Sequence, residues 1–291
     1  MSNYVIVSDG SCDLTQEDAK KLNVEIVPFY VVFENEQYLK EGVDVSAADF
    51  YQKMIDNPNI FPKSSLPSVE DYVSCFEKHL RDGKDIICLC ITTKFSGSYN
   101  SASSAKQLLE EEYPERKITI IDTMVNTVLQ GLVVREATRL RDLGYEYNKL
   151  VDIINEKKTT GRIFFTVKEL TYLQHGGRIG KVASIVGDLM KISPIIVLKE
   201  GEIHQGGIAL SRKRALLKVK ELAKSYVDSN KGKKFVLCVG YGYDKEEGTN
   251  FVETLSKVFP DQDIILNHIG ATIGVHTGPY PIGVGILEKF D

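Results

Sequence analysis

The sequence predicts an α/β protein in two parts, an N-terminal, mostly parallel sheet with flanking helices and a C-terminal α+β domain. In the first part, short apolar runs alternate with helical segments, which is the pattern of a mostly parallel sheet. After "KKTTGR" a hairpin pattern enters among the helices. A length of 291 residues suits two ordinary domains. We therefore place the boundary near Lys158, which gives domains 1–158 and 159–291.

Helix caps and apolar runs define the elements of the first part. The apolar run 4–8 ends in an Asp-Gly-Ser turn, as a strand does. Thr15, Ser46 and Ser68 each precede a helical pattern as N-caps. The run 25–33 alternates weakly, as expected of a strand buried on both faces. The expected elements are strand 4–8, helix 16–22, strand 25–33, helix 47–56, a turn-rich linker 57–68, helix 69–81, strand 85–91, helix 101–112, strand 118–122, helix 125–143 and helix 147–157.

The second part mixes a hairpin with helices, which favours an α+β arrangement. The hairpin is read from "LKEGEI", where charged residues and a glycine separate two apolar runs. The expected elements are strands 163–167 and 194–198 with two helices between them, hairpin 198–203, helix 211–228, strand 235–240, helix 246–258, strand 263–269 and a short, strand-like tail 272–287.

Bulk properties exclude several classes of protein. The net charge is −4 and both signs are spread along the chain, which argues against a nucleic-acid partner. No apolar run reaches the roughly 20 residues that span a bilayer, and "MSNYVIVSDG" lacks the basic start of a signal peptide. The five cysteines form no CxxC pair, which indicates reduced thiols. We expect a cytoplasmic protein.

Hydroxyl groups crowd the junction between strand 85–91 and the helix that follows. In an open α/β sheet, ligands bind beyond the carboxyl ends of the strands, and a helix N-terminus attracts anions. Ser96 and Gly97 therefore predict a site for a phosphate or a carboxylate, although capping alone would also explain one of the serines. A nucleophilic serine is the other alternative, but the G-x-S-x-G elbow is absent.

Other motifs are ambiguous when each is taken alone. "KSSLPS" leaves Ser64 and Ser65 unexplained once Ser68 serves as a cap, and His276 precedes a Thr-Gly-Pro turn. "GGRIGKV" is not a P-loop, because Val182 stands where Mg²⁺ needs a hydroxyl. Arg178 projects from this glycine turn as a solvated cation or as a docking residue. Turn chemistry and a catalytic aspartate explain "SDGSCD" equally well, and no spacing of His and Cys suggests a metal site.

Taken in order, the motifs are specific. "SDGSCDL", "KSSLPS", "ITTKFSGSYNSA", "IDTMV", "LTYLQHGGRIGKVASIVGDLMKISPII" and "IGVHTGPY" span the whole chain, which thereby resembles the DegV family of bacterial fatty-acid-binding proteins. The resemblance implies a long-chain fatty acid held between the two domains. Its carboxylate would be bound at Ser64, Ser96 and His276, with Ser65, Gly97 and Thr277 beside them in the same motifs. Compared with the usual family pattern, Ser64 and Ser98 replace Thr, Leu66 replaces Gln and Tyr280 replaces Gly.

The resemblance also implies that binding of the fatty acid and its phosphorylation belong to two different proteins. Members of the family include the acyl-carrier subunit of fatty acid kinase, in which a separate kinase subunit brings ATP and phosphorylates the bound acid. The chain would then be a carrier and not an enzyme, with no cofactor or metal of its own, and Arg178 would contact the kinase. Candidates for the tail pocket are Phe95, Ile185, Leu189 and Ile192. The alternatives are a small-molecule hydrolase using Ser96 with His276, and a binding module for another lipid-like anion.

Overall fold

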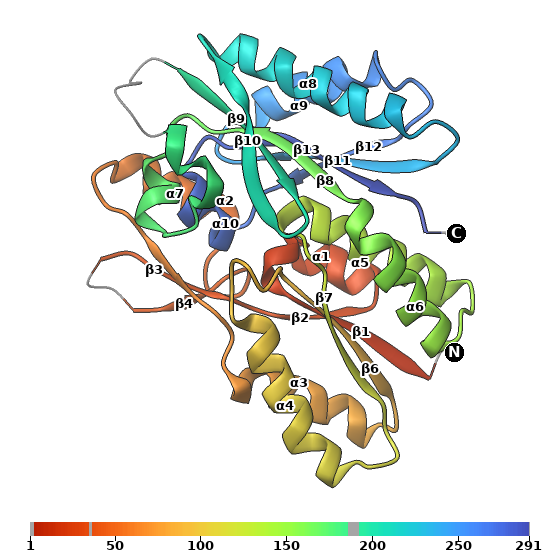
Figure 1. The fold of residues 1–291 in the computed structure, drawn as a ribbon. Coiled ribbons are helices and arrows are strands. Elements are labelled where there is room, and N and C mark those ends of the chain that lie inside the picture. Colours follow the sequence, from red (N-terminus) through yellow and green to blue (C-terminus); the bar gives the residue numbers. More distant parts are fainter. Residues whose placement is uncertain (1–2, 35–36, 186–191, 291) are drawn as a thin grey trace.

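The computed structural model describes residues 3–34, 37–185 and 192–290, and it places helices on the faces of two main sheets (Figure 1). The strand orders are β2-β1-β6-β7, β10-β9-β8-β13-β11-β12 and, in a small third sheet, β4-β3-β5. The strands are β1 (Tyr4–Asp9), β2 (Val24–Val27), β3 (Tyr30–Val32), β4 (Leu39–Lys40), β5 (Lys63–Ser65), β6 (Asp85–Cys90), β7 (Ile118–Asp122), β8 (Arg162–Thr166), β9 (Ser193–Lys199), β10 (Glu202–Ala209), β11 (Phe235–Tyr241), β12 (Ile264–His268) and β13 (Ile282–Glu288). The predicted fold class is confirmed.

Three helices begin where the sequence predicts a cap. The side chains of Thr15, Ser46 and Ser68 each accept a hydrogen bond from the amide three residues later, at 3.0–3.1 Å. The helices are α1 (Gln16–Lys21), α2 (Ala47–Asp56), α3 (Val69–Arg81), α4 (Ser98–Glu112), α5 (Thr127–Asp142), α6 (Tyr147–Lys157), α7 (Thr171–His175), α8 (Arg212–Ser229), α9 (Lys245–Ser256) and α10 (Ala271–Thr277). Among them, none combines the length and apolar character that crossing a membrane requires.

The first sheet is parallel throughout, because β1 pairs in parallel with β2 and β6, and β6 with β7. Helices α3 and α4 pack against this sheet over an apolar cluster that includes Val7, Phe76 and Cys88. The five cysteines carry free thiols. In a parallel sheet of this kind the loops at the carboxyl ends of the strands gather at one edge, and the site described below lies there.

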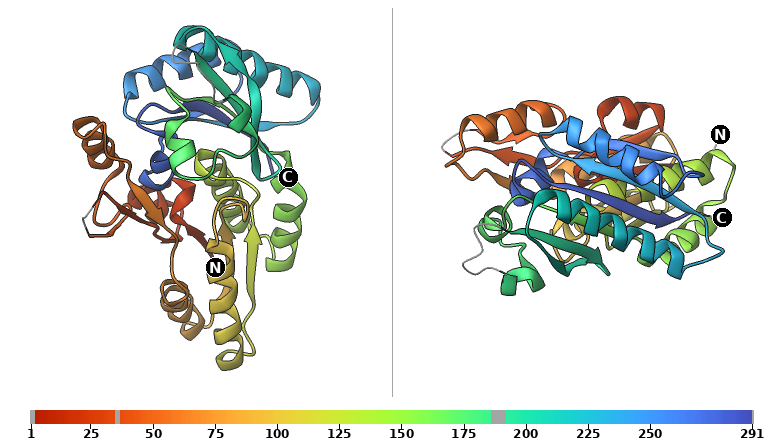
Figure 2. Two further views of the ribbon diagram at one scale, coloured as in Figure 1. Left: turned by 60° about the vertical axis from the view of Figure 1, so that its left-hand side comes forward. Right: turned by 90° about the horizontal axis from the view of Figure 1, so that it is seen from above.

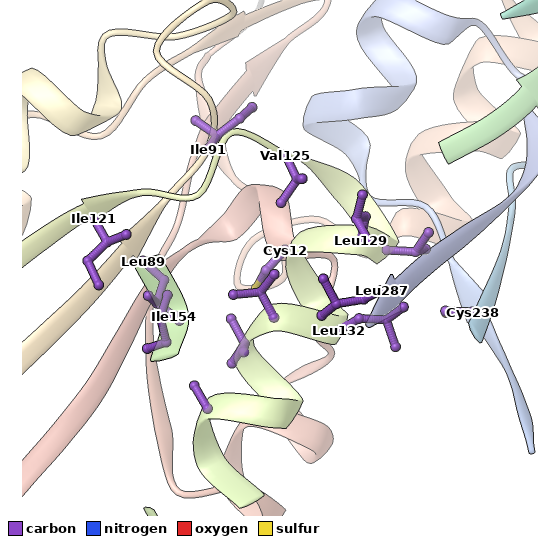
Figure 3. Packing of buried hydrophobic residues seen from close by; sticks show 14 of the residues in the cluster. Cys12, Leu89, Ile91, Ile121, Val125, Leu129, Leu132, Ile154, Cys238 and Leu287 are labelled. Carbon is purple, nitrogen blue, oxygen red and sulfur yellow. The ribbon is translucent and has the colours of Figure 1, made fainter. Parts of the chain in front are cut away.

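The second sheet is mixed, an arrangement that is common in α+β folds. The β9–β10 hairpin forms one edge, β13 pairs antiparallel with β8 and β11, and β11 pairs in parallel with β12. Helices α8 and α9 cover one face, and α5 contacts β11 and β13 on the other. A Cβ at Gly240 would lie 3.0 Å from Val128 of α5, so the glycine allows this close packing. Figure 3 shows Leu129 and Leu132 of α5 beside Leu287 of β13. The domain boundary at 158/159 stays a prediction.

The predicted strand 25–33 is wrong as a single element. It breaks at Pro28, which has no N–H to donate to a ladder. Strand β2 ends before the proline in the first sheet, and β3 continues beyond it in the small sheet. There β3 pairs antiparallel with β5, a strand inside the segment that was predicted to be a linker.

The strand-like tail 272–287 is also wrong over its first half, which forms helix α10 before β13 begins. Every residue of α10 except His276 is buried, so its sequence is apolar on all sides. Such a run cannot be distinguished from a buried strand by periodicity. Figure 2 shows α10 between the small sheet and the second main sheet.

Candidate ligand-binding site

A cavity of about 230 Å³ is lined by residues of the second main sheet, of the small sheet and of the segments that follow β2 and β6 of the first sheet. Its lining is mostly apolar and includes Ile91 and Phe95 after β6, Phe165 on β8, and Leu198 and Ile203 in the β9–β10 hairpin. Sequence periodicity did not single out most of these residues, because it cannot say which face of a strand borders a cavity. The predicted residues Ser64, Ser65, Phe95, Ser96, Arg178, His276 and Thr277 all line it.

Serine and histidine side chains from segments far apart in the chain meet at the polar end of this cavity. Ser64 Oγ lies 3.2 Å from His276 Nε2. Burial, and then the nearby positive charge of Arg178, lower the pKa of His276 to about 4. The imidazole is therefore neutral near pH 7 and offers a hydrogen bond without a charge.

The small sheet and α10 bring Ser64 and His276 together. Ser64 pairs with Val31 on β3, which fixes its position in β5. Helix α10 contacts β3 and β5, so that His276 near its end faces the strand. The turn after α7 approaches the ring from another side, and a Cβ at Gly176 would lie 2.0 Å from His276 Nδ1. This position therefore requires glycine.

The serines after β6 have different roles. Ser96 Oγ accepts from the Ser98 amide at 3.2 Å, and Ser96 lines the cavity. Ser98, which begins α4, is fully buried and hydrogen-bonds Tyr72 and Asp9 instead. Gly97 is not among the cavity-lining residues, and its Cα faces Leu66. Only Ser96 of this group thus reaches the cavity.

Asp9 holds the base of the Ser96 loop. Its carboxylate accepts from the Ile91 amide at 2.9 Å and from Ser98 Oγ at 2.7 Å. Ser11 Oγ and Gln130 Nε2 donate to its other oxygen at 2.6 and 2.9 Å. Burial raises the pKa of Asp9, and these hydrogen bonds oppose the rise. From the sequence, Asp9 could be either a turn residue or a catalytic nucleophile. In the structure its carboxylate accepts hydrogen bonds from buried donors of the protein itself.

A second acidic group lies behind the cavity. Glu41 accepts hydrogen bonds from the amide and hydroxyl of Thr272, at the start of the helix that carries His276. Thr127, which lines the cavity, donates to Asp13. Burial raises the pKa of Glu41 to about 7 and raises that of Asp13 well above its usual range. The protonation of Glu41 thus bears on how α10 is held.

We expect Glu41→Gln to remove part of the pH dependence of stability. The folded state raises the pKa of Glu41 from 4.5 to about 7, so the group stabilises the fold below its unfolded pKa and this stabilisation is lost as the pH rises through 7. Between pH 5 and 8 the free energy of unfolding of the parent should fall relative to the variant by about 2 kcal/mol. Urea unfolding of the parent and of the variant at pH 5 and pH 8 measures this difference. An equal change in the free energy of unfolding of both proteins between the two pH values would contradict the raised pKa of Glu41.

Of the four tail-pocket candidates, only Phe95 lines the cavity in the described part of the structure. Ile192 is partly buried against the main apolar core and is not among the residues that line the cavity. Leu189 and the side chain of Ile185 lie outside the described residues.

The geometry does not favour a serine hydrolase. His276 Nε2 faces Ser64, and no hydrogen bond joins Ser96 to His276 in the described part of the chain. His276 Nδ1 is buried and has no hydrogen-bond partner there. A hydrolytic triad needs a third group to orient the histidine, and no residue in the described ranges fills that role at His276.

Comparisons with known proteins identify the family of the chain. A family model described as "Uncharacterised protein, DegV family" matches residues 3–289. A DegV domain-containing protein of Clostridium perfringens is 30% identical over 284 residues, which cover 98% of each chain. A solved stearic-acid-binding protein of Eubacterium ventriosum is 42% identical with a TM-score of 0.95, covering 99% of each chain. A DegV family protein of Thermus thermophilus, solved in a study of fatty acid binding, is 27% identical with a TM-score of 0.88, covering 98% of this chain and 99% of its own.

Proposed function

Because the chain belongs to the DegV family, we propose that it binds a long-chain fatty acid, with the carboxylate at Ser64, Ser96 and His276. The observation that carries this proposal is a single cavity that joins a polar end to an apolar wall. The likeness to the stearic-acid-binding protein supports it. In this proposal Ser65 and Thr277 add to the polar lining, and Gly97 lies in the loop beside Ser96 and packs close to Leu66.

The energetics fit a carboxylate with an alkyl tail. A hydrogen bond to a charged acceptor contributes about 1.5–3 kcal/mol. Each buried CH₂ adds about 0.8 kcal/mol, so a chain of roughly sixteen carbons could gain on the order of 10 kcal/mol before the costs of binding. The polar residues thus set the position of the ligand, and the apolar wall provides most of the affinity.

We further propose that the chain is a carrier that presents the acid to a kinase. The bound carboxylate would become an acyl phosphate with ATP supplied by that partner. None of the described residues hydrogen-bonds His276 Nδ1, which supports a binding role over hydrolysis. Because the partner would supply the ATP, and Val182 stands where a P-loop has Ser or Thr, we expect the isolated chain not to bind Mg-ATP. Detection of tight Mg-ATP binding by calorimetry would contradict this.

Mass spectrometry of an organic extract of the purified protein tests the function. We expect a fatty acid in near-equal amount to the protein, and much less in a Ser96→Ala preparation. An empty protein that hydrolyses ester substrates would support the hydrolase instead. A co-purified anion of another class would identify a binding module with a different ligand.

Arg178→Ala should slow phosphorylation by the partner kinase while leaving palmitate affinity nearly unchanged. Arg178 is exposed and lies at the edge of the cavity, where its charge can guide an acidic partner surface. Its Nε and Nη1 donate to the carbonyls of Phe95 and Gly176 at 3.0 and 2.7 Å, so a structural role must be tested as well. We expect about a tenfold lower rate at limiting kinase, and raised salt should mimic this in the parent.

Thermal melting distinguishes the two roles of Arg178. A large fall in melting temperature with an unchanged phosphorylation rate per folded molecule would make it a structural residue.

A further inference from the structure

A second pocket of about 250 Å³ opens beside the fatty-acid cavity. We call it the basic pocket, because its charged residues are Lys94, Arg178, Lys181 and Glu202. It shares Phe95, Arg178 and Ile203 with the cavity. Arg178 donates to the carbonyl of Phe95, which precedes Ser96, and to that of Gly176, which packs against His276. The two pockets therefore adjoin beside Ser96 and His276.

The charged groups of the basic pocket come from three separate segments. Lys94 follows β6, Lys181 belongs to the 3-10 helix Gly180–Ile185, and Glu202 begins β10. The turn before Glu202 is anchored on the loop of Lys94, because Thr92 Oγ1 donates to the Gly201 carbonyl at 3.1 Å. The fold therefore fixes the backbones of Lys94 and Glu202 relative to each other.

This pocket holds three cations and one carboxylate. Glu202 lies 2.6 Å from Lys181 Nζ and 3.8 Å from Lys94 Nζ. The formal charge of the four groups is +3 − 1 = +2 at neutral pH. The two lysine side chains are 62% and 58% exposed, so their contacts with Glu202 are weak. A more highly charged anion can therefore exchange for this carboxylate.

We propose that the basic pocket binds the phosphoryl group of an acyl phosphate whose acyl chain lies in the cavity. This rests on the proposed fatty-acid function. In the step itself, a carboxylate oxygen attacks the γ-phosphorus of a nucleoside triphosphate supplied by the kinase. The new C–O–P linkage forms as the bond from the γ-phosphorus to the β–γ bridging oxygen breaks. The diphosphate leaves with that electron pair, and no proton is taken up or released.

Phosphorylation increases the negative charge of the ligand head group, which is why a separate basic pocket would be needed to bind it. The carboxylate carries one negative charge, whereas the phosphoryl group of the product carries about two and has three acceptor oxygens. Ser64, Ser96 and His276 are neutral and suit the monoanion. Lysine ammonium groups are established binders of phosphate, and Lys94 and Lys181 line the pocket that shares Phe95 and Arg178 with the cavity.

The test compares palmitate with its acyl phosphonate, in which CH₂ replaces the bridging oxygen and prevents hydrolysis. Calorimetry of the full chain should give about tenfold weaker phosphonate binding for the Lys94→Gln, Lys181→Gln double variant, with palmitate affinity within about twofold. Glu202→Gln should strengthen phosphonate binding about threefold, because the competing carboxylate is gone. Lys257→Gln, beyond the end of α9, is the matched control and should change neither.

The outcomes separate this inference from the function on which it rests. Equal weakening of both ligands by the double variant, or no effect on either, would overturn the phosphoryl site while palmitate binding by the parent still supported the function. A parent that bound neither ligand would reject both. Competition by millimolar inorganic phosphate as strong as that by the acyl phosphonate would also overturn it, since the pocket would then hold free phosphate. Melting temperatures confirm that each variant is folded.

Discussion

His276→Ala is expected to weaken palmitate binding by about 10- to 100-fold and to leave the protein folded. The ring lies at the polar end of the cavity, with Nε2 3.2 Å from Ser64 Oγ. Loss of a hydrogen bond to a carboxylate costs about 1.5–3 kcal/mol, and each 1.4 kcal/mol is a factor of ten in affinity. Calorimetric titration with palmitate measures the change. Ser96→Ala should weaken binding in the same direction.

Further variants test whether His276 acts together with Ser64. Because the two side chains touch, the Ser64→Ala and His276→Ala double variant should lose less than the sum of the single changes. His204→Ala, on β10 and away from the cavity lining, serves as the histidine control. The pKa of His276 is about 4, so its titration should not alter palmitate affinity between pH 6 and 8. Parent-like affinity in both Ser96→Ala and His276→Ala would refute the head-group assignment.

Asp9→Ala should cause the largest loss of stability, about 3–5 kcal/mol in the free energy of unfolding. The carboxylate is fully buried and accepts from the backbone of Ile91 and from Ser11, Ser98 and Gln130. Removing it takes from the Ile91 amide its acceptor and takes one hydrogen bond from each of Ser11, Ser98 and Gln130, which keep other polar neighbours. An unpaired buried group costs about 1–3 kcal/mol, and the weakened network adds to that cost. Urea denaturation provides the measurement.

A matched aspartate provides the control for Asp9. Asp244 is an exposed cap that accepts from the Glu247 amide at 2.9 Å, and Asp244→Ala should cost only about 1 kcal/mol. If Asp9→Ala is too unstable to purify, Asp9→Asn retains one acceptor and should show a smaller loss. It should also weaken palmitate binding, because Asp9 fixes the ends of the loop that carries Ser96. A loss no greater than that of Asp244→Ala would contradict this account.

The sequence predicted the elements whose signals are local. The caps at Thr15, Ser46 and Ser68 satisfy amides only three residues away, so their effect is visible without a tertiary structure. The alternation of strands and helices likewise reports burial within each segment. The structure contains the elements that both kinds of signal predict, and the fold class follows from the order of those elements.

Features that depend on distant segments escaped prediction. Strand β3 pairs with β5, which lies about 30 residues further along the chain, and Pro28 separates β3 from β2. Neither relation is visible in the local pattern of the sequence. Helix α10 lacks a polar face because neighbouring elements surround it. For the site, residue type and motif singled out Ser64, Ser96 and His276, but their convergence on one cavity is a tertiary property. Nothing in "SDGSCD" distinguishes a carboxylate that anchors the Ser96 loop from one that closes a turn.

The position of β13 in the second sheet has a consequence for synthesis of the protein. Strands β8 and β11 both pair with β13, whose residues 282–288 emerge from the ribosome more than 40 residues after β11 and more than 100 after β8. Until then, β8 and β11 present unpaired edges, which are prone to intermolecular pairing. His276 and the strand that completes the sheet appear almost together. A nascent chain therefore cannot hold its ligand early, and we expect chaperones to engage it chiefly during that interval.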